Sequence, residues 1–141
     1  MNYFTKLTLL IFFTSITTFA SEYVVIANKN LNTTLSKEQI KAIFLKKIIL
    51  VNDIELVPLN LKVDAKLRKE FQKEILNMSF TRLQNYWIKE HYLGVRPPLN
   101  LHSQQSIKLF VQKVDGAIGY IESRYLDDNL LELYRWSNSV Q

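Results

Sequence analysis

The sequence predicts an α/β protein, in which a sheet is covered by helices on both faces. Apolar runs rich in β-branched residues, which are typical of buried strands, occur at 22–28 and 116–122. Segments with apolar residues at helical spacing lie between these runs, and no internal repeat, low-complexity stretch or linker interrupts the chain. Strands and helices that mix along one domain favour a layered arrangement, so we expect a three-layer sandwich.

The first twenty residues are typical of a secretory signal peptide. Lys6 provides an early positive charge, a mainly apolar run extends from Leu7 to Phe13, and Thr18-Phe19-Ala20 has the small-x-small pattern of a cleavage site. The apolar run is shorter than the roughly 20 residues that a membrane span needs. We therefore expect cleavage after Ala20 and export to the periplasm, with an uncleaved N-terminal anchor as the alternative.

Residues 21–141 would then form a single domain, and its composition limits what it can do. This length is enough for one compact core. The whole chain carries 18 basic and 13 acidic residues, which are interspersed, so it favours small anions weakly and lacks the basic footprint of a nucleic-acid-binding protein. It contains no cysteine, which excludes disulfides and thiolate metal sites.

Four elements are expected in the first half of the domain. A buried strand at 22–28 is followed by a helix that begins after Ser36, with Gln39 completing a possible capping box. Two short strands, IILV and IELVPLN, then flank a turn at Asn52-Asp53, and Pro58 in the second strand indicates a sheet edge or an early strand end. The apolar side of the helix is expected to contain Leu35, Ile40, Ile43 and Phe44.

Two helices and a loop are expected next. Asp64 takes the position of an N-cap ahead of a helix over 65–76, and Ser79 is expected to cap a third helix over 80–92. The segment LGVRPPLN at 93–100 is expected to be a loop, because it combines a glycine with two adjacent prolines. The residues expected to face inward are Leu67, Phe71 and Ile75 in the first of these helices, and Leu83 and Trp87 in the second.

A fourth helix over about 103–113 and strands at 116–122 and 130–136 complete the expected order. The last strand is expected at a sheet edge, where Tyr134 and Trp136 would be open to pairing. The other aromatic residues of this cluster in the second half are expected as core and rim that cover the sheet, namely Tyr86, Trp87, Tyr92, Tyr120 and Tyr125. The sequence therefore places its most accessible aromatic residues at the C-terminal end of the domain.

Two of the three glycines fall in one run, KVDGAIGYIE. We expect Gly116 to take a positive φ in the turn after the fourth helix, because glycine does so at little cost. Gly119 lies inside a strand, so it is expected to let a helix or a ligand approach the backbone closely.

The same run carries a resemblance to a known family. LFVQKVDGAIGYIESRYL resembles the signature of the C-terminal lobe of periplasmic phosphate-binding proteins, in which a helix ending in FVQ leads through a turn to a GAIGY strand. LSKEQIKAIFLKK, LRKEFQKEIL and YWIKEHYLGVRPP resemble further segments of this family and of its short, single-domain relatives, in the same order. The resemblance extends from Tyr23 to Leu126.

The resemblance implies a type 2 periplasmic-binding-protein-like fold with a central mixed sheet, of which this chain would form about one lobe. Full-length members have two lobes that enclose the ligand between them, and residues 21–141 are too few for both. In the family, phosphate binds at a loop and helix N-terminus that read Gly-Ser-Gly-Thr or Gly-Ser. Backbone N–H groups and the positive end of the helix dipole favour an anion there.

The corresponding loop in this chain, NLKVDAKLR, departs from the family pattern. Ala65 takes the position of the family's serine, so a hydroxyl donor is absent, and Asp64 takes a glycine position, where its carboxylate would repel phosphate. Arg68 matches the short relatives, while Lys62 and Lys66 can compensate in charge. Alternatively, Asp64 only caps its helix and Arg68 pairs with a nearby acid. The candidate ligand-binding residues that the resemblance implies are Asn60, Asp64, Ala65, Lys66 and Arg68.

Two functions stay open. In the first, an exported protein with this degenerate anion loop binds phosphate or another small anion for uptake or sensing. In the second, the lobe binds no ligand and acts as a protein-interaction or sensor-adaptor module, with a membrane transporter or a sensor protein as its partner. No enzyme, cofactor or metal site is indicated, because His91 and His102 lie in separate segments without paired carboxylates and no nucleophile motif occurs. No nucleic-acid partner is expected, and the oligomeric state is left open.

Overall fold

The computed structural model describes residue 15 and residues 20–138. The signal peptide expected over residues 1–20 therefore lies almost wholly outside the described residues and stays a prediction, as does the domain boundary that follows it. Within the described residues, no helix is long and apolar enough to cross a membrane.

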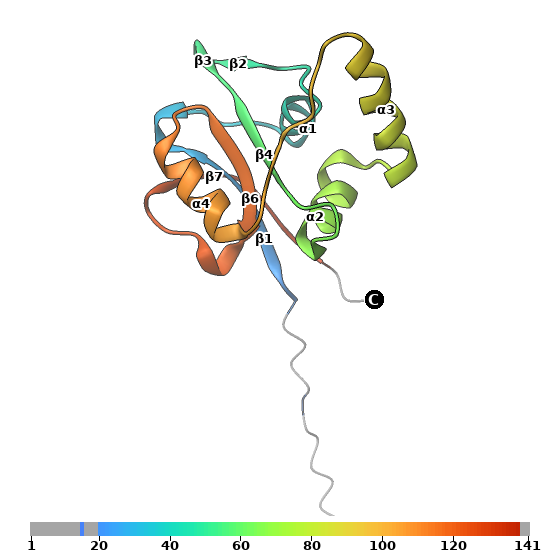
Figure 1. The fold of residues 1–141 in the computed structure, drawn as a ribbon. Coiled ribbons are helices and arrows are strands. Elements are labelled where there is room, and N and C mark those ends of the chain that lie inside the picture. Colours follow the sequence, from blue (N-terminus) through green and yellow to red (C-terminus); the bar gives the residue numbers. More distant parts are fainter. Residues whose placement is uncertain (1–14, 16–19, 139–141) are drawn as a thin grey trace, which may run out of the picture.

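A five-stranded sheet forms the centre of the protein (Figure 1). Its strands are β1 (Glu22–Asn28), β4 (Val57–Leu61), β5 (Leu99–Leu101), β6 (Ala117–Glu122) and β7 (Leu130–Ser137), and a separate hairpin joins β2 (Leu50–Val51) to β3 (Ile54–Glu55). The strand order is β5-β4-β6-β1-β7. β1 pairs antiparallel with β6 and β7, while β4 pairs parallel with β5 and β6, so the sheet is mixed as the resemblance implies.

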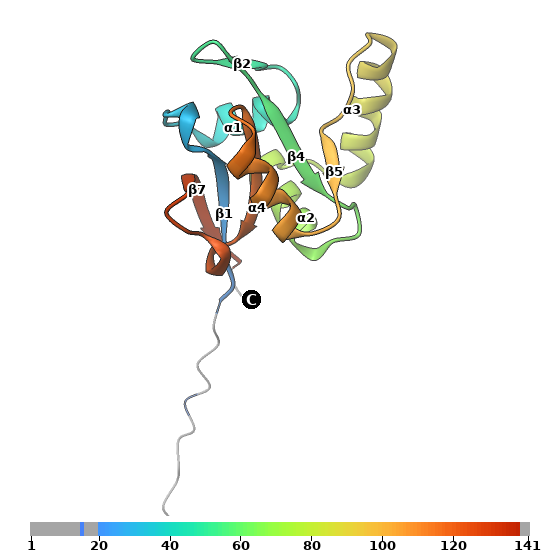
Figure 2. The ribbon, with the colours of Figure 1, turned by 60° about the vertical axis from the view of Figure 1, so that its left-hand side comes forward.

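Helices cover both faces of this sheet. They are α1 (Lys37–Phe44), α2 (Lys66–Phe71), which continues as a π-helical turn (Gln72–Leu76), α3 (Phe80–Tyr92) and α4 (Gln104–Lys113), with short 3-10 turns at Lys29–Leu31 and Ser123–Tyr125. α4 packs on one face, α1 and α2 on the other, and α3 lies beyond α2 at the side (Figures 1 and 2). The predicted α/β class and three-layer arrangement are confirmed.

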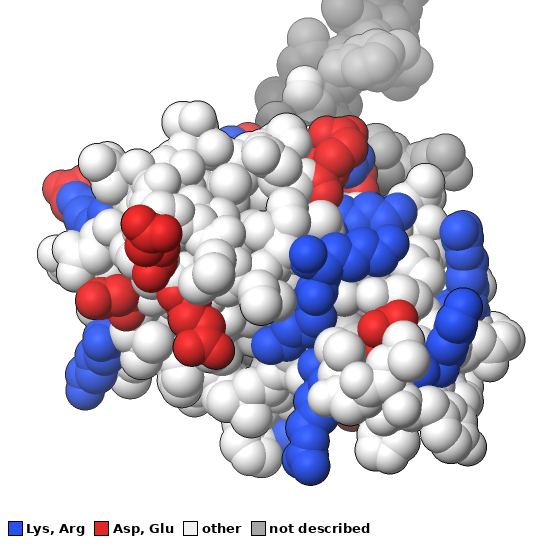
Figure 3. Space-filling view, turned by 90° about the horizontal axis from the view of Figure 1, so that it is seen from above, with Lys and Arg blue, Asp and Glu red and all other residues white. Residues whose placement is uncertain are grey.

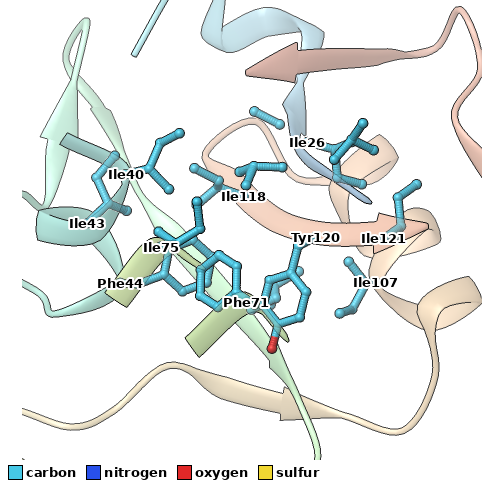
Figure 4. Close-up of a cluster of buried hydrophobic side chains, with 14 of the residues drawn as sticks. Ile26, Ile40, Ile43, Phe44, Phe71, Ile75, Ile107, Ile118, Tyr120 and Ile121 are labelled. Carbon is cyan, nitrogen blue, oxygen red and sulfur yellow. The ribbon is translucent and has the colours of Figure 1, made fainter. Parts of the chain in front are cut away.

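Neighbouring residues of β6 point into the two different layers. Gly119 faces Ile107 of α4. Tyr120 points to the opposite face, because side chains alternate along a strand, and it stacks on Phe71 with ring centroids 4.0 Å apart. Phe44 of α1 lies 4.6 Å from the Phe71 ring, so one aromatic cluster joins α1, α2 and the sheet (Figure 4).

The helix starts predicted from serine caps are confirmed. Ser36 Oγ accepts from the Gln39 N–H at 3.1 Å, and the Ser36 N–H donates to Gln39 Oε1 at 2.8 Å, which completes the capping box. Ser79 and Ser103 cap α3 and α4, and each hydroxyl accepts from the N–H three residues later. These caps satisfy N–H groups that the first turn of a helix leaves without a helical partner.

The prediction that Asp64 caps α2 is wrong. The N-cap is Ala65, which has no side chain that could accept a hydrogen bond, and Asp64 is exposed in the turn before it. A backbone bond sets this turn instead, since the Ala65 N–H donates to the Lys62 carbonyl oxygen at 3.0 Å. The helix therefore starts one residue later than side-chain chemistry favours.

Two predictions about strands are also wrong. Pro58 marks neither a sheet edge nor a strand end, because β4 lies between β5 and β6 and continues to Leu61. Val57 donates to Gly116 on the β6 side, so the Pro58 nitrogen points the other way, where pairing with β5 begins only at Leu59. The segment 93–100 is not all loop, since β5 begins at Leu99.

The C-terminal strand β7 lies at a sheet edge, as predicted. The prediction that both of its aromatic residues, Tyr134 and Trp136, are open to a partner is wrong. Trp136 is buried, with its ring 5.3 Å from that of Tyr23, and belongs to the core. Tyr134 is half-buried, and its hydroxyl donates to Glu74 at 2.9 Å. The side chains of this edge strand are therefore already engaged within the protein.

The two glycines of β6 and the preceding turn serve close packing. Gly116 does not take a positive φ, and Gly94 is the glycine that does. A Cβ at Gly116 would overlap the carbonyl oxygen of Glu55, so the passage of β3 against this turn requires glycine. A Cβ at Gly119 would lie 2.6 Å from Ile107 Cγ2, so the close approach of α4 explains that glycine as expected.

Candidate functional site

β4 and β5 bring two helix starts to one edge of the sheet. The strands are parallel neighbours, with Leu61 opposite Leu101, so their carboxyl ends lie together. β4 leads through residues 62–65 into α2, and β5 leads through His102 and Ser103 into α4. Figure 2 shows the ends of β4 and β5 side by side, with both helices beginning below them. Ligands in open α/β sheets commonly bind at the carboxyl ends of strands.

A pocket of about 360 Å³ lies between these helix starts, and we name it the edge pocket. Both segments that follow the parallel strands contribute to it, together with the end of β6. Its lining includes Leu61, Ala65, Lys66, His102, Ser103, Gln104 and Glu122. The parallel pairing of β4 and β5 therefore assembles a site from residues some forty positions apart in the chain.

The first backbone N–H groups of α2 and α4 have no acceptor within their own helix. In α2 the first helical bond runs from the Lys69 N–H to the Ala65 carbonyl oxygen at 3.2 Å, so the N–H groups of 66–68 have no helical acceptor. In α4 the Ser103 hydroxyl caps one such group, and those of 104 and 105 remain. These donors and the positive ends of the two helix dipoles favour an anion in the edge pocket.

One cation and one carboxylate line the edge pocket. Lys66, the first residue of α2, is exposed and adds positive charge at the mouth. Glu122 accepts from Gln104 Nε2 at 3.0 Å and pairs with Arg124 Nε at 2.7 Å. The Glu122 charge is therefore compensated by its own partners, and the pocket keeps a positive character.

Arg68 does not reach the edge pocket. Its Nη1 donates to the Leu61 carbonyl oxygen at 2.7 Å and to Asn100 Oδ1 at 3.1 Å, so the guanidinium ties the end of β4 to β5. Its side chain lines a separate groove between α2 and α3. Among the described residues, no acidic side chain forms an ion pair with it, which overturns the alternative that Arg68 pairs with a nearby acid. Arg68 therefore links β4 to β5, the two strands that lead into α2 and α4.

Asn60 lies beneath the site rather than in it. It is buried, and Oδ1 accepts from the Tyr120 hydroxyl at 3.0 Å, while that hydroxyl accepts from the Leu61 N–H at 3.1 Å. Burial raises the pKa of Tyr120 well above its usual value, so the phenol stays protonated and keeps both bonds. This chain of bonds fixes the end of β4 at the point where the loop to α2 begins.

The structure thus separates the five predicted site residues into two groups. Ala65 and Lys66 line the edge pocket, whereas Asn60, Asp64 and Arg68 do not. Sequence reasoning missed His102, Ser103 and Gln104, which come from the second helix start. The Ser103 cap was recognisable, but its proximity to α2 follows from β5, a three-residue strand inside a segment that the sequence marks as loop.

Restoring a hydroxyl at position 65 is expected to stabilise the protein. Ala65→Ser should raise the free energy of unfolding by about 1 kcal/mol, because a serine at the N-cap can accept from a free N–H of α2. Urea unfolding followed by circular dichroism measures this change. Asp64→Ala is the matched control and should have little effect, since Asp64 is not the cap. A larger loss from Asp64→Ala than gain from Ala65→Ser would contradict the observed cap.

Comparison with known proteins identifies similar structures. No protein-family model matches the chain, and no curated protein sequence matches it significantly. A protein from Clostridium perfringens, assigned as a phosphate ABC transporter substrate-binding protein and solved with bound phosphate, is 26% identical with a TM-score of 0.66, over 81% of this chain and 45% of that one. The chain is similar to phosphate ABC transporter substrate-binding proteins. An ABC-type phosphate transport receptor from Vibrio cholerae shares the fold, with 16% identity and a TM-score of 0.64 over 82% of this chain and 47% of that one.

The chain spans less than half the length of both of these transport proteins. Its described part therefore corresponds to about one lobe of their fold, as the resemblance implies. Both neighbours are proteins of phosphate transport rather than enzymes, which points away from catalysis. Between residues 20 and 138, no group of His, Asp and Glu side chains is arranged to hold a metal ion.

Proposed function

We propose that the protein is exported and binds phosphate or a similar oxoanion in the edge pocket, for uptake or sensing. The observation that carries this proposal is the meeting of two helix starts at one pocket, with N–H groups from α2 and α4 free to donate. The similarity to a protein with bound phosphate supports the choice of ligand. A membrane transporter or a sensor protein would receive the loaded protein.

The anion would be held mainly by the backbone. Helix N-termini bind phosphate through N–H groups and the dipole, so the absence of a serine at Ala65 removes one donor and leaves the others. Lys66 adds a positive charge beside them, and the Ser103 hydroxyl lies at the second helix start. Asp64 is exposed outside the pocket lining, so its carboxylate does not occupy the place of the anion.

Titration calorimetry with phosphate, at low salt, tests the proposal. Wild-type protein should give saturable heat, and Lys66→Glu should weaken the phosphate affinity by about tenfold, because a charge at the pocket mouth is reversed. Lys69→Glu is the matched control, since it makes the same charge change on the same helix away from the edge pocket. Protein purified from the periplasm should be used, and its mass shows whether it begins at Ser21.

The ligand-free interaction module is the second candidate. It is favoured by the position of Arg68, whose guanidinium is engaged with Leu61 and Asn100 instead of facing the edge pocket. No heat with phosphate, sulfate or small carboxylates would support this candidate and overturn the first. Equal weakening of phosphate binding by Lys66→Glu and Lys69→Glu would locate the anion outside the edge pocket.

A further inference from the structure

A second hollow, also of about 360 Å³, lies between the end of α1 and the side of α3. We name it the basic hollow. Four cations line it, and the apolar part of its lining includes Leu45 and the Tyr86 ring. The cations are Lys41, Lys47, Arg82 and Lys89. The basic hollow shares no lining residue with the edge pocket, so it is a separate feature of the protein.

The turn after α1 builds one wall of the basic hollow. Lys46 has a φ of 59°, and this left-handed residue turns the chain so that the Lys47 N–H donates to the Ala42 carbonyl oxygen at 2.8 Å. Lys47 Nζ then lies 5.8 Å from the centroid of the Tyr86 ring. The Tyr86 hydroxyl donates to the Leu45 carbonyl oxygen at 2.7 Å, so α3 is fastened to the end of α1.

The four cations are not neutralised inside the protein. None of them forms an ion pair with an acidic residue of the described chain. Burial, and after it the negative charge of Glu90, raises the pKa of Tyr86, so Glu90 is one carboxylate near a hollow lined by four cations. Figure 3 shows Lys and Arg side chains gathered in a band on one side of the upper face, with most acidic side chains on the other side. The basic hollow therefore carries a surplus of positive charge from its four lining cations.

Helix stability accounts for some of these cations but not for Arg82. Lys41 and Lys89 lie in the last turns of α1 and α3, where the negative end of the helix dipole favours a positive charge. Arg82 lies in the first turn of α3, where the dipole disfavours it. The position of Arg82 therefore does not stabilise α3, which indicates that this cation has a role at the surface.

We propose that the basic hollow binds an acidic segment of a partner protein. Carboxylates of such a segment complement the four cations, and an apolar side chain between them can contact Leu45 and Tyr86. The hollow is concave, which suits a protruding peptide better than the flat surface of a membrane. Three of the cations are lysines, whose single charge pairs as well with a carboxylate as with a phosphate.

Fluorescence anisotropy with a labelled glutamate-rich peptide carrying a central leucine tests the proposal. Binding should saturate and weaken as salt rises, because exposed charges are screened beyond about 8–10 Å. Arg82→Glu should weaken peptide binding by about tenfold. This variant should unfold at an unchanged or higher temperature, because a glutamate at 82 completes a capping box with Ser79. Lost binding could then not be attributed to lost folding.

The controls separate this hollow from non-specific attraction and from the edge pocket. Lys69→Glu makes the same charge change outside the basic hollow and should bind the peptide like the wild type. The Arg82→Glu variant should bind phosphate with wild-type affinity, because Arg82 does not line the edge pocket. Failure of peptide binding can therefore be distinguished from failure of phosphate binding. No peptide binding by the wild type, or equal weakening by both variants, would overturn the proposal. Binding to anionic phosphatidylglycerol vesicles that depends on Arg82, without peptide binding, would also overturn it and identify a membrane site.

Discussion

Replacing Phe71 with alanine is expected to lower the free energy of unfolding by about 3–5 kcal/mol, the range for removing a fully buried aromatic ring. Phe71 is 1% exposed and stacks almost parallel on Tyr120, at 4.0 Å and 7°. It also lies 4.6 Å from the Phe44 ring and 6.3 Å from that of Trp136. The substitution would therefore leave a cavity between α1, α2 and β6 (Figure 4), next to Trp136 of β7.

Urea unfolding followed by circular dichroism measures this loss, with Phe80→Ala as the matched control. Phe80 is 57% exposed at the start of α3, so its removal should change stability by no more than about 0.5 kcal/mol. Because small domains are stable by only about 5–15 kcal/mol, Phe71→Ala should leave a much less stable protein. Similar losses from the two variants would contradict the position of Phe71 at the centre of the core.

The removal of the Phe71 ring should also disturb the edge pocket, because the two are connected through Tyr120. Tyr120 holds the end of β4 through the Leu61 N–H and Asn60 Oδ1, and Phe71 holds the Tyr120 ring. The aromatic cluster and the edge pocket are therefore parts of one continuous arrangement. The pocket owes its shape to residues that a ligand would not touch.

Local signals made most of the elements predictable from sequence. A serine cap followed by apolar residues at helical spacing identifies a helix start within a few residues, because the cap and the first turn interact directly. Ser36 and Ser79 cap their helices as predicted, and the helix predicted from about residue 103 begins after a third serine cap, Ser103. The strand at β1 was recognisable for a similar reason, since a strand buried on both faces needs a continuous apolar run.

The features that sequence reasoning missed depend on distant contacts. β5 has only three residues and forms because β4 offers it a parallel partner, which no local pattern encodes. Pro58 is accepted inside the sheet because β5 pairs with β4 only from the next residue onward. The start of α2 at Ala65 follows from a backbone turn closed on Lys62, which competes successfully with the capping preference of Asp64.

The same limit applies to the candidate site. The family resemblance indicated the loop before α2 as the anion site, and two of the predicted residues, Ala65 and Lys66, line the edge pocket. The second half of the pocket comes from the α4 start, whose proximity depends on the pairing of β4 with β5. A site built from the α2 start alone lacks the serine hydroxyl of the family pattern. A site with two helix starts has other backbone donors, which is why we retain an anion as the ligand.

Replacing Gly116 with alanine is expected to lower the free energy of unfolding by about 3 kcal/mol, the upper end of the range for overpacking a tight site. The added Cβ would overlap the carbonyl oxygen of Glu55 and lie 3.2 Å from Ile54 Cγ2. Backbone cannot yield as a flexible side chain can, and it is further fixed because the Val57 N–H donates to the Gly116 carbonyl oxygen at 2.8 Å. Relief of the overlap would have to separate β3 from the turn before β6.

Gly94→Ala is the control that distinguishes close packing from backbone conformation. Gly94 has a φ of 80° with open space around its Cβ position, so alanine there should cost only about 1–2 kcal/mol, the penalty of a left-handed residue with a side chain. Gly116 has no positive φ, and its whole cost should come from the contact with β3. Urea unfolding of both variants gives the comparison. A smaller loss for Gly116→Ala than for Gly94→Ala would mean that β3 moves aside readily, and that this turn does not need glycine for packing.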